Sequence, residues 1–297
     1  MTAFLFPGQG AQAVGMVGEL RPAAKVLFDE AAEILGYDLH DLCANGPAER
    51  LNETDVSQPA IFVASMAALE TLKETTPEVV EGVTATAGLS LGEYTALAFA
   101  GALTFRDALQ VVKARGEAMQ AAARATPSGM LAVLGLEPSE VAVLVAEARV
   151  AGTLEIANLL CPGNTVISGT LEALDKFEQV CLARGGIRTS RLAVAGAFHT
   201  TLMKPADERL AEALAQVTVS APRIPVWSNV DAKPHTNPAE IRALLVRQVL
   251  SAVRWEATIR GLMAAGADKF YEIGPGRVLA GLLKRVDRKA NMTNVSA

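Results

Sequence analysis

The chain has 297 residues, of which 51% are apolar and 20% charged, enough for one large domain or a domain with an inserted subdomain. The formal net charge of −5 argues against nucleic acid as the main partner. No apolar run approaches the roughly 18 residues that a membrane span needs, so no membrane association is expected.

The N-terminus and the cysteines favour a cytoplasmic protein. The first ten residues carry no basic stretch and reach Pro7 and Gly8 at once, which is a poor signal peptide. The cysteines, Cys43, Cys161 and Cys181, are odd in number and lack metal-ligand spacing. We therefore expect reduced thiols and no metal site.

The first 125 residues predict helices packed on strands. A short strand at 3–6 ends in a glycine-rich turn, and a second strand is expected at 83–87. Apolar residues recur every three or four positions in the predicted helices, with Thr104 as the N-cap of the last. These helices are at 23–35, 58–71, 92–100 and 105–123.

The middle of the chain predicts a small subdomain. After a turn at 126–129, strands are expected at 130–135, 154–158, 165–168 and 187–194, with helices at 138–148 and 171–184. The order strand–helix–strand–strand–helix–strand is ferredoxin-like. We therefore predict an inserted subdomain at 126–196. Residues 1–125 and 197–297, with further strands at 224–229 and 269–273, would form one larger α/β domain.

The clearest local signal is the sequence Gly-Leu-Ser-Leu-Gly at 88–92, between a predicted strand and a predicted helix. This pattern is typical of a nucleophile elbow, in which flanking glycines permit a tight turn that exposes the serine. Ser90 would then lie at a helix N-terminus, where the N–H group of Leu91 can hold an oxyanion.

A serine nucleophile needs a base, and the chain has only three histidines. His40 is flanked by acids and His235 lies in a polar loop, so both are predicted at the surface. His199 lies where the inserted subdomain returns to the large domain, and clefts are common at such junctions. It is the predicted base. The acids between Ser90 and His199 include Glu93, but none has a loop signature, so no triad is assigned and a dyad oriented by a backbone carbonyl or an amide stays open.

Six separated blocks resemble the malonyl-CoA:acyl-carrier-protein transacylase family, whose relatives are the acyltransferase domains of polyketide synthases. The blocks are FPGQGAQ (6–12), GLSLGEYTA (88–96), RGEAMQ (115–120), GAFH (196–199), QVLSAVRW (248–255) and EIGPG (272–276). The blocks occur in the same order as in the family, and the resemblance extends over essentially the whole chain. The resemblance implies an α/β-hydrolase-like large domain that carries a ferredoxin-like small one.

The family also implies roles for single residues. Ser90 would be the nucleophile and His199 the general base, with the backbone N–H groups of Gln9 and Leu91 as the oxyanion hole. The main-chain carbonyl of Gln248 would orient the histidine in place of an acid.

Two further matched positions concern the acyl group. Arg115 would bind the free carboxylate of malonate, for which a planar guanidinium is well suited. Phe198 matches a position associated with a preference for malonyl over methylmalonyl, a size discrimination of about 1–3 kcal/mol per methylene.

Three positions depart from the family pattern. Leu89 stands where many members have histidine, Leu160 where many have asparagine, and Ala252 where proline is usual. Some members of the family do have leucine at the first position. The second departure puts details of the small-domain side of the cleft in doubt, and the third could loosen the segment after Gln248.

The implied function is transfer of a malonyl group from malonyl-CoA to the phosphopantetheine thiol of acyl carrier protein, by a ping-pong route, in fatty-acid synthesis. No cofactor is expected beyond malonyl-CoA as a substrate. A polyketide acyltransferase acting in trans, a serine thioesterase or hydrolase, and a non-catalytic scaffold subunit remain alternatives. Carrier proteins of this class are typically acidic, so basic residues at 184–191 and 284–289 are docking candidates.

Overall fold

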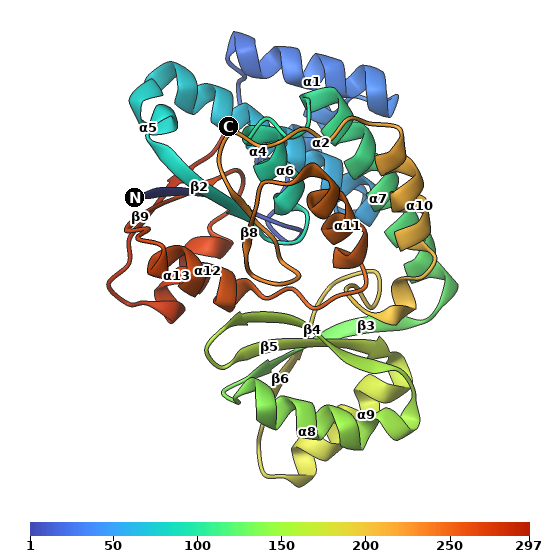
Figure 1. The fold of residues 1–297 in the computed structure, drawn as a ribbon. Coiled ribbons are helices and arrows are strands. Elements are labelled where there is room, and N and C mark those ends of the chain that lie inside the picture. Colours follow the sequence, from blue (N-terminus) through green and yellow to red (C-terminus); the bar gives the residue numbers. More distant parts are fainter.

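The computed structural model describes residues 1–297 and contains two sheets (Figure 1). The large sheet has the order β10-β9-β1-β2-β7-β8, and all its neighbours are parallel except β7 and β8. Its strands are β1 (Thr2–Phe6), β2 (Val83–Gly88), β7 (Val226–Trp227), β8 (Pro234–His235), β9 (Lys269–Ile273) and β10 (Met292–Val295). The helices around it are α1 (Pro22–Leu35), α2 (Leu39–Asn45), α3 (Ala48–Leu51), α4 (Thr54–Thr75), α5 (Pro77–Glu81), α6 (Gly92–Phe99), α7 (Phe105–Ala125), α10 (Ala206–Ala215), α11 (Pro238–Gln248), α12 (Trp255–Ala264) and α13 (Val278–Val286).

Both faces of the large sheet are buried. On β1, Phe4 and Phe6 point into the core under α1, α4, α6 and α7, while Ala3 and Leu5 point to a second core under α12 and α13. Side chains alternate across a strand, so this central strand is apolar on both sides. A parallel sheet covered by helices on both faces is the architecture that the sequence predicts for the large domain.

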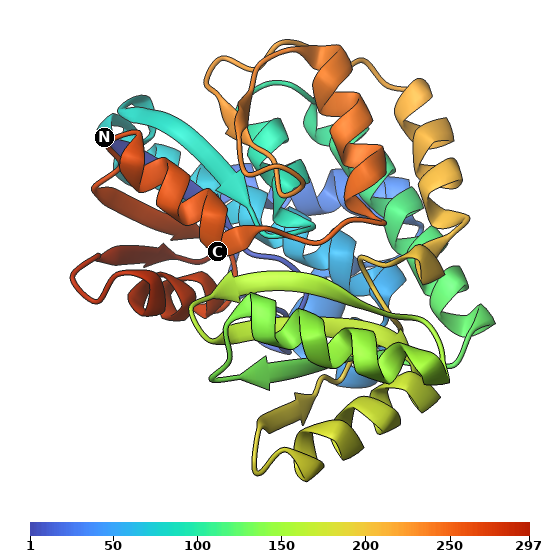
Figure 2. The same ribbon diagram turned by 60° about the horizontal axis from the view of Figure 1, so that its bottom comes forward.

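The small sheet is antiparallel, with the order β4-β5-β3-β6. Its elements are β3 (Ser128–Leu134), α8 (Pro138–Ala148), β4 (Leu154–Cys161), β5 (Asn164–Thr170), α9 (Leu171–Ala183) and β6 (Arg188–Arg191). Helices α8 and α9 cover the face of this sheet that points away from the rest of the molecule (Figures 1 and 2). They enclose a core of their own around Leu131, Leu144 and Phe177. The predicted ferredoxin-like order of elements is confirmed, and all of them lie within the predicted 126–196 block.

Several boundaries differ from the sequence prediction. Helix α4 begins at Thr54 rather than near residue 58, because its first turn is held by a tertiary contact in which the Thr54 N–H group donates to Gln120 Oε1 at 2.8 Å. The strand expected at 187–194 is only Arg188–Arg191, the residues that pair with β3. Strands β8 and β10 were not predicted, since both are short, polar and formed only by pairing at the sheet edges.

The prediction for His235 needs correction. His235 is not in a free loop: it lies on β8 with 15% of its side chain exposed and contacts Asp231 and Glu240. No helix of the structure combines the length and the apolar character that crossing a bilayer requires.

The glycines of the predicted elbow are required by close packing. A Cβ atom on Gly92 would lie 2.1 Å from the carbonyl oxygen of Phe6, and one on Gly88 would lie 1.9 Å from the carbonyl carbon of Gly92. These contacts fix the distance between the end of β1, the end of β2 and the start of α6. The glycines of this sequence pattern are therefore required for close backbone packing as well as for the turn.

We expect Gly92→Ala to lower the free energy of unfolding by about 3 kcal/mol, because the backbone at the end of β1 and the start of α6 would have to move apart. Gly281→Ala is the matched control, since a Cβ atom there has nothing within 4 Å and should stabilise α13 by about 0.5–1 kcal/mol. Urea denaturation of both variants measures the difference. Equal changes in the free energy of unfolding in the two variants would show that the elbow tolerates a side chain at Gly92.

Candidate active site

The predicted nucleophile lies on the turn between β2 and α6, at the carboxyl edge of the large sheet. Ser90 has φ = 49°, in the left-handed region that non-glycine residues rarely adopt. Its N–H group donates to Asn229 Oδ1 at 2.6 Å, so a side chain from the segment after β7 holds the turn. Ser90 is half-buried and lines a cavity, and a strained backbone at such a serine is the expected geometry of a nucleophile elbow.

The predicted base reaches the serine. Ser90 Oγ lies 2.8 Å from His199 Nε2, although the two residues are 109 positions apart. His199 Nδ1 lies 2.9 Å from the main-chain oxygen of Gln248 at the end of α11. A carbonyl oxygen only accepts, so Nδ1 must carry the proton and Nε2 is the free acceptor. The ring is thus in the tautomer that can take the Ser90 proton. No carboxylate contacts the imidazole.

Burial keeps the imidazole neutral. His199 is 4% exposed, and its pKa is lowered from 6.5 to about 4, first by burial and then by the nearby Arg115 guanidinium. A neutral imidazole is the form that acts as a general base. The site therefore holds its base in the competent state throughout the neutral pH range.

This pKa predicts the pH profile of the acylation step. Neutral His199 is the active form, so a pKa near 4 leaves about 97% of the base competent at pH 5.5, whereas a pKa of 6.5 would leave about 9%. We expect the rate of acyl-serine formation, followed by quenched intact mass spectrometry, to fall only below about pH 5. A fall centred near pH 6.5 would show that the histidine is solvated.

Arg115 on α7 lies directly beside the nucleophile. Its Nη2 atom donates to Ser90 Oγ at 2.9 Å and to Gln248 Oε1 at 3.0 Å, and its Nη1 atom donates to Gln58 Oε1 at 2.6 Å. The guanidinium also lies over the ring of Tyr94, 5.3 Å from its centroid. Burial lowers its pKa, but an arginine retains its proton in proteins.

The charge of Arg115 has no direct anionic partner. The side chain is 1% exposed, its hydrogen bonds go to two amides and a hydroxyl, and no carboxylate forms an ion pair with it. Its Nε atom has no partner at all. A buried cation without an anion is costly unless a ligand supplies one. The site is therefore suited to an acyl group that carries a negative charge.

The predicted oxyanion donors are placed near the same turn. The backbone N–H groups of Gln9, just after β1, and of Leu91, just before α6, donate to no protein acceptor. Leu91 itself is fully buried. The N–H group of Ser90 is occupied by Asn229 and is thus excluded from the hole. The roles of Gln9 and Leu91 stay predictions.

A cavity of about 280 Å³ opens beside the dyad and is mostly apolar. Phe198, 5% exposed, forms part of its wall, as do Met119 and Met130. Leu89 and Leu160, two departures from the family pattern, also line it, so both make the cleft more apolar. The third departure does not loosen its segment: Val253, next to Ala252, exchanges backbone hydrogen bonds with β4 at 2.8 and 2.9 Å.

The structure adds three polar residues that the sequence reading did not select. Glu93, Asn229 and Gln58 surround the dyad and Arg115, and all are buried. Glu93 was considered as a triad acid, but its carboxylate contacts the Gln248 side chain, not His199. The only sequence signal for Glu93 is its place in the first turn of the helix that follows the predicted nucleophile.

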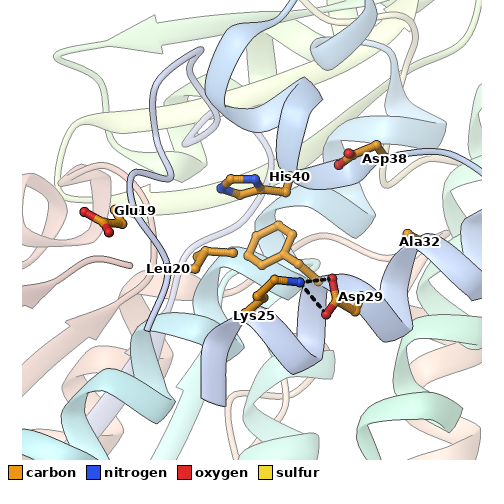
Figure 3. Close-up of a pocket in the computed structure, with 8 residues that line it drawn as sticks. Glu19, Leu20, Lys25, Asp29, Ala32, Asp38 and His40 are labelled. Carbon is orange, nitrogen blue, oxygen red and sulfur yellow. Dashed lines mark hydrogen bonds and ion pairs between the residues drawn. The ribbon is translucent and has the colours of Figure 1, made fainter. Parts of the chain in front are cut away.

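A larger cavity of about 420 Å³ lies elsewhere, between α1 and α2 (Figure 3). His40 lies at its edge with Nε2 3.2 Å from the carbonyl oxygen of Gly18, and a Lys25–Asp29 ion pair on α1 forms part of its wall. It contains no residue of the dyad and no nucleophile beside the histidine. No three His, Cys, Asp or Glu side chains converge as metal ligands anywhere in the structure.

Comparison with known proteins agrees with this geometry. The family model described as "Acyl transferase domain" matches residues 3–296. The chain is 44% identical over 300 residues to the malonyl CoA-acyl carrier protein transacylase of Bacillus subtilis, covering 99% of this chain and 93% of that protein. It is 43% identical to the mitochondrial transacylase of Mus musculus, covering 97% of this chain and 80% of that protein.

Solved structures give the same result. The malonyl CoA-acyl carrier protein transacylase of Coxiella burnetii superposes with a TM-score of 0.93 at 37% identity, covering 99% of this chain and 93% of that one. A malonyl-transacylase solved in complex with a type II polyketide acyl-carrier protein has a TM-score of 0.93 at 37% identity, with coverage of 99% and 95%.

Proposed function

This chain belongs to the acyl transferase family, and we propose that it transfers a malonyl group from malonyl-CoA to the thiol of an acyl carrier protein. The malonyl group is proposed because the buried Arg115 guanidinium has no anionic partner. Its Nη2 atom lies 2.9 Å from Ser90 Oγ. A malonyl group offers a carboxylate to this cation, whereas an acetyl group does not.

The proposed reaction has two halves. His199 Nε2 takes the proton of Ser90 Oγ as the oxygen attacks the thioester carbon, and the oxyanion is held by the N–H groups of Gln9 and Leu91. The carbon–sulfur bond breaks, and the thiol of coenzyme A leaves with the proton from His199. In the second half, His199 deprotonates the carrier thiol, whose sulfur attacks the malonyl ester carbon. The bond from that carbon to Ser90 Oγ breaks, and Ser90 Oγ takes the proton back from His199.

Intact mass spectrometry tests this proposal directly. The protein is mixed with malonyl-CoA in the absence of carrier protein, with acetyl-CoA and the Ser90→Ala variant in parallel. We expect a malonyl adduct on the wild type only, and none from acetyl-CoA. Absence of both an adduct and thioester consumption would overturn the enzymatic proposal.

A hydrolase is the main alternative chemistry, since thioesterases use the same elbow. Rapid release of free malonate without an accumulated adduct would favour it. The assignment to fatty-acid synthesis is also a proposal. One similar structure is a polyketide malonyl-transacylase, so parallel transfer assays with carrier proteins of both pathways would decide between them.

The structure narrows the candidates for carrier docking. Arg184 and Arg191 are already ion-paired, with Glu147 and with Asp175 and Glu178 respectively. The remaining candidates are exposed and form no ion pair: Arg188 on β6, and Lys284, Arg285, Arg288 and Lys289 at the end of α13. These two groups flank the cavity, which is lined by Leu192 just after β6 and by Leu282 of α13.

We expect Arg188→Glu combined with Arg285→Glu to raise the KM for an acidic carrier protein by about 10-fold at low salt, because rim charges act mainly on association. Formation of the malonyl-serine adduct should not change. Arg184→Gln, which loses an internal ion pair, is the control and should leave the KM unchanged. An unchanged KM in the double variant would place docking elsewhere.

A cytoplasmic location is proposed on the chemistry of the cysteines. Cys43, Cys161 and Cys181 are all buried and free, and burial raises the pKa of each thiol. Such thiols persist in a reducing compartment. Relatives include mitochondrial transacylases, so localisation of a tagged chain in its native cell is the deciding measurement.

A further inference from the structure

The buried carboxylate of Glu93 contacts neither the nucleophile nor the base. It is the second residue of α6, three positions after Ser90, and is 3% exposed. One oxygen, Oε2, accepts from Gln248 Nε2 at 2.7 Å and from the backbone N–H group of Asn229 at 3.0 Å. Burial raises its pKa to about 7, against the effect of these donors. The family-implied roles above give this residue no task.

Gln248 connects Glu93 to Arg115. Its side-chain nitrogen donates to Glu93 Oε2 and, at 3.0 Å, to the main-chain oxygen of Ser90. Its side-chain oxygen accepts from Arg115 Nη2 at 3.0 Å. In its ionised form the Glu93 carboxylate only accepts, and the guanidinium only donates, so the amide lies between an acceptor and a donor.

This arrangement determines which way the amide points. With Nε2 toward Glu93, Oε1 must face the guanidinium. If the amide rotated by half a turn, its NH₂ group would face the donors of Arg115 and its oxygen would face the carboxylate. Both contacts would be repulsive in a fully buried site, since Gln248 is 0% exposed.

We propose that Glu93 is a positioning residue for acyl selectivity: as a hydrogen-bond acceptor it orients the Gln248 amide, which in turn holds the Arg115 guanidinium beside Ser90. This inference rests on the proposed malonyl transfer. It assigns Glu93 no part in proton transfer, because the base is oriented by the main chain of Gln248, not by its side chain.

Two variants separate the acceptor from the charge. Glu93→Gln and Glu93→Met both remove the negative charge, but only glutamine keeps an oxygen for Gln248 Nε2 and Asn229. Each is assayed for kcat/KM with malonyl-CoA and for acylation by p-nitrophenyl acetate, a neutral ester that needs Ser90 and His199 but offers no carboxylate to Arg115. The ratio of the two rates is the readout, because partial unfolding lowers both equally.

We expect the ratio in Glu93→Met to be about 10-fold lower than in Glu93→Gln, the effect of weakening one charged hydrogen bond to Arg115. Acylation by the neutral ester should differ by less than about threefold. Equal ratios in the two variants would overturn the proposal. If neither rate is detectable in the wild type, the proposed function fails rather than the role of Glu93.

Gln248→Met provides a second route if Glu93→Met does not fold. It removes the amide but leaves the main-chain carbonyl that orients His199, so the ratio should fall by a similar factor. Adding Glu93→Gln to Gln248→Met should not lower the ratio further, because Glu93 acts through that amide. An unchanged ratio in Gln248→Met, or a further fall in the double variant, contradicts the proposal.

Discussion

Ser90→Ala, His199→Ala and the double variant are expected to lose the same fraction of malonyl-transfer activity, about 10⁴- to 10⁶-fold in kcat. Ser90 Oγ and His199 Nε2 are 2.8 Å apart, and the hydroxyl is a weak nucleophile without the base. Removing either group stops the same step. The second substitution should therefore lower kcat little further.

The measurement is transfer of labelled malonyl to carrier protein, with folding checked by thermal denaturation. His199→Gln is a useful companion, since it fills the site but provides no base at neutral pH. Additive losses, with the double variant far below either single one, would mean that the two side chains act in separate steps.

Arg115→Met is expected to lower kcat/KM for malonyl-CoA by about 10²- to 10⁴-fold, while acylation by a neutral ester changes little. This estimate assumes that Arg115 makes two hydrogen bonds to the malonyl carboxylate and that each contributes about 1.5–3 kcal/mol. The guanidinium is buried beside Ser90 without an anionic partner, so the substrate carboxylate is the group that would pair with it.

Two controls sharpen this test. Arg115→Lys keeps the charge but loses the planar fork, so a partial loss is expected. Arg124→Met removes an exposed arginine from the same helix and should have no effect on either substrate. If Arg115→Met lowers malonyl transfer and neutral-ester acylation by the same factor, the arginine acts on the nucleophile and not on the acyl group.

The sequence by itself determined the local structure of the site. The Gly-Leu-Ser-Leu-Gly turn, the strand before it and the helix after it are set by residues that are neighbours in the chain. The ferredoxin-like order followed from the period of the apolar residues. With only three histidines, His199 could also be chosen as the base. The distances around Ser90 agree with the roles that the resemblance implied for Ser90, His199 and Gln248, and these roles stay predictions.

Only the tertiary structure decided how these parts meet. The order of the large sheet brings the segment after β7 and the end of α11 to the serine, so Asn229 and Gln248 reach it across 139 and 158 positions. Contacts at such separations depend on sheet order and helix packing, which no local pattern encodes. The burial of Glu93 behind the Gln248 amide is likewise invisible in a sequence that shows a charged residue in the first turn of a helix. The sequence thus selected Ser90 as the predicted nucleophile and His199 as the predicted base, whereas the fold decided which polar groups surround them.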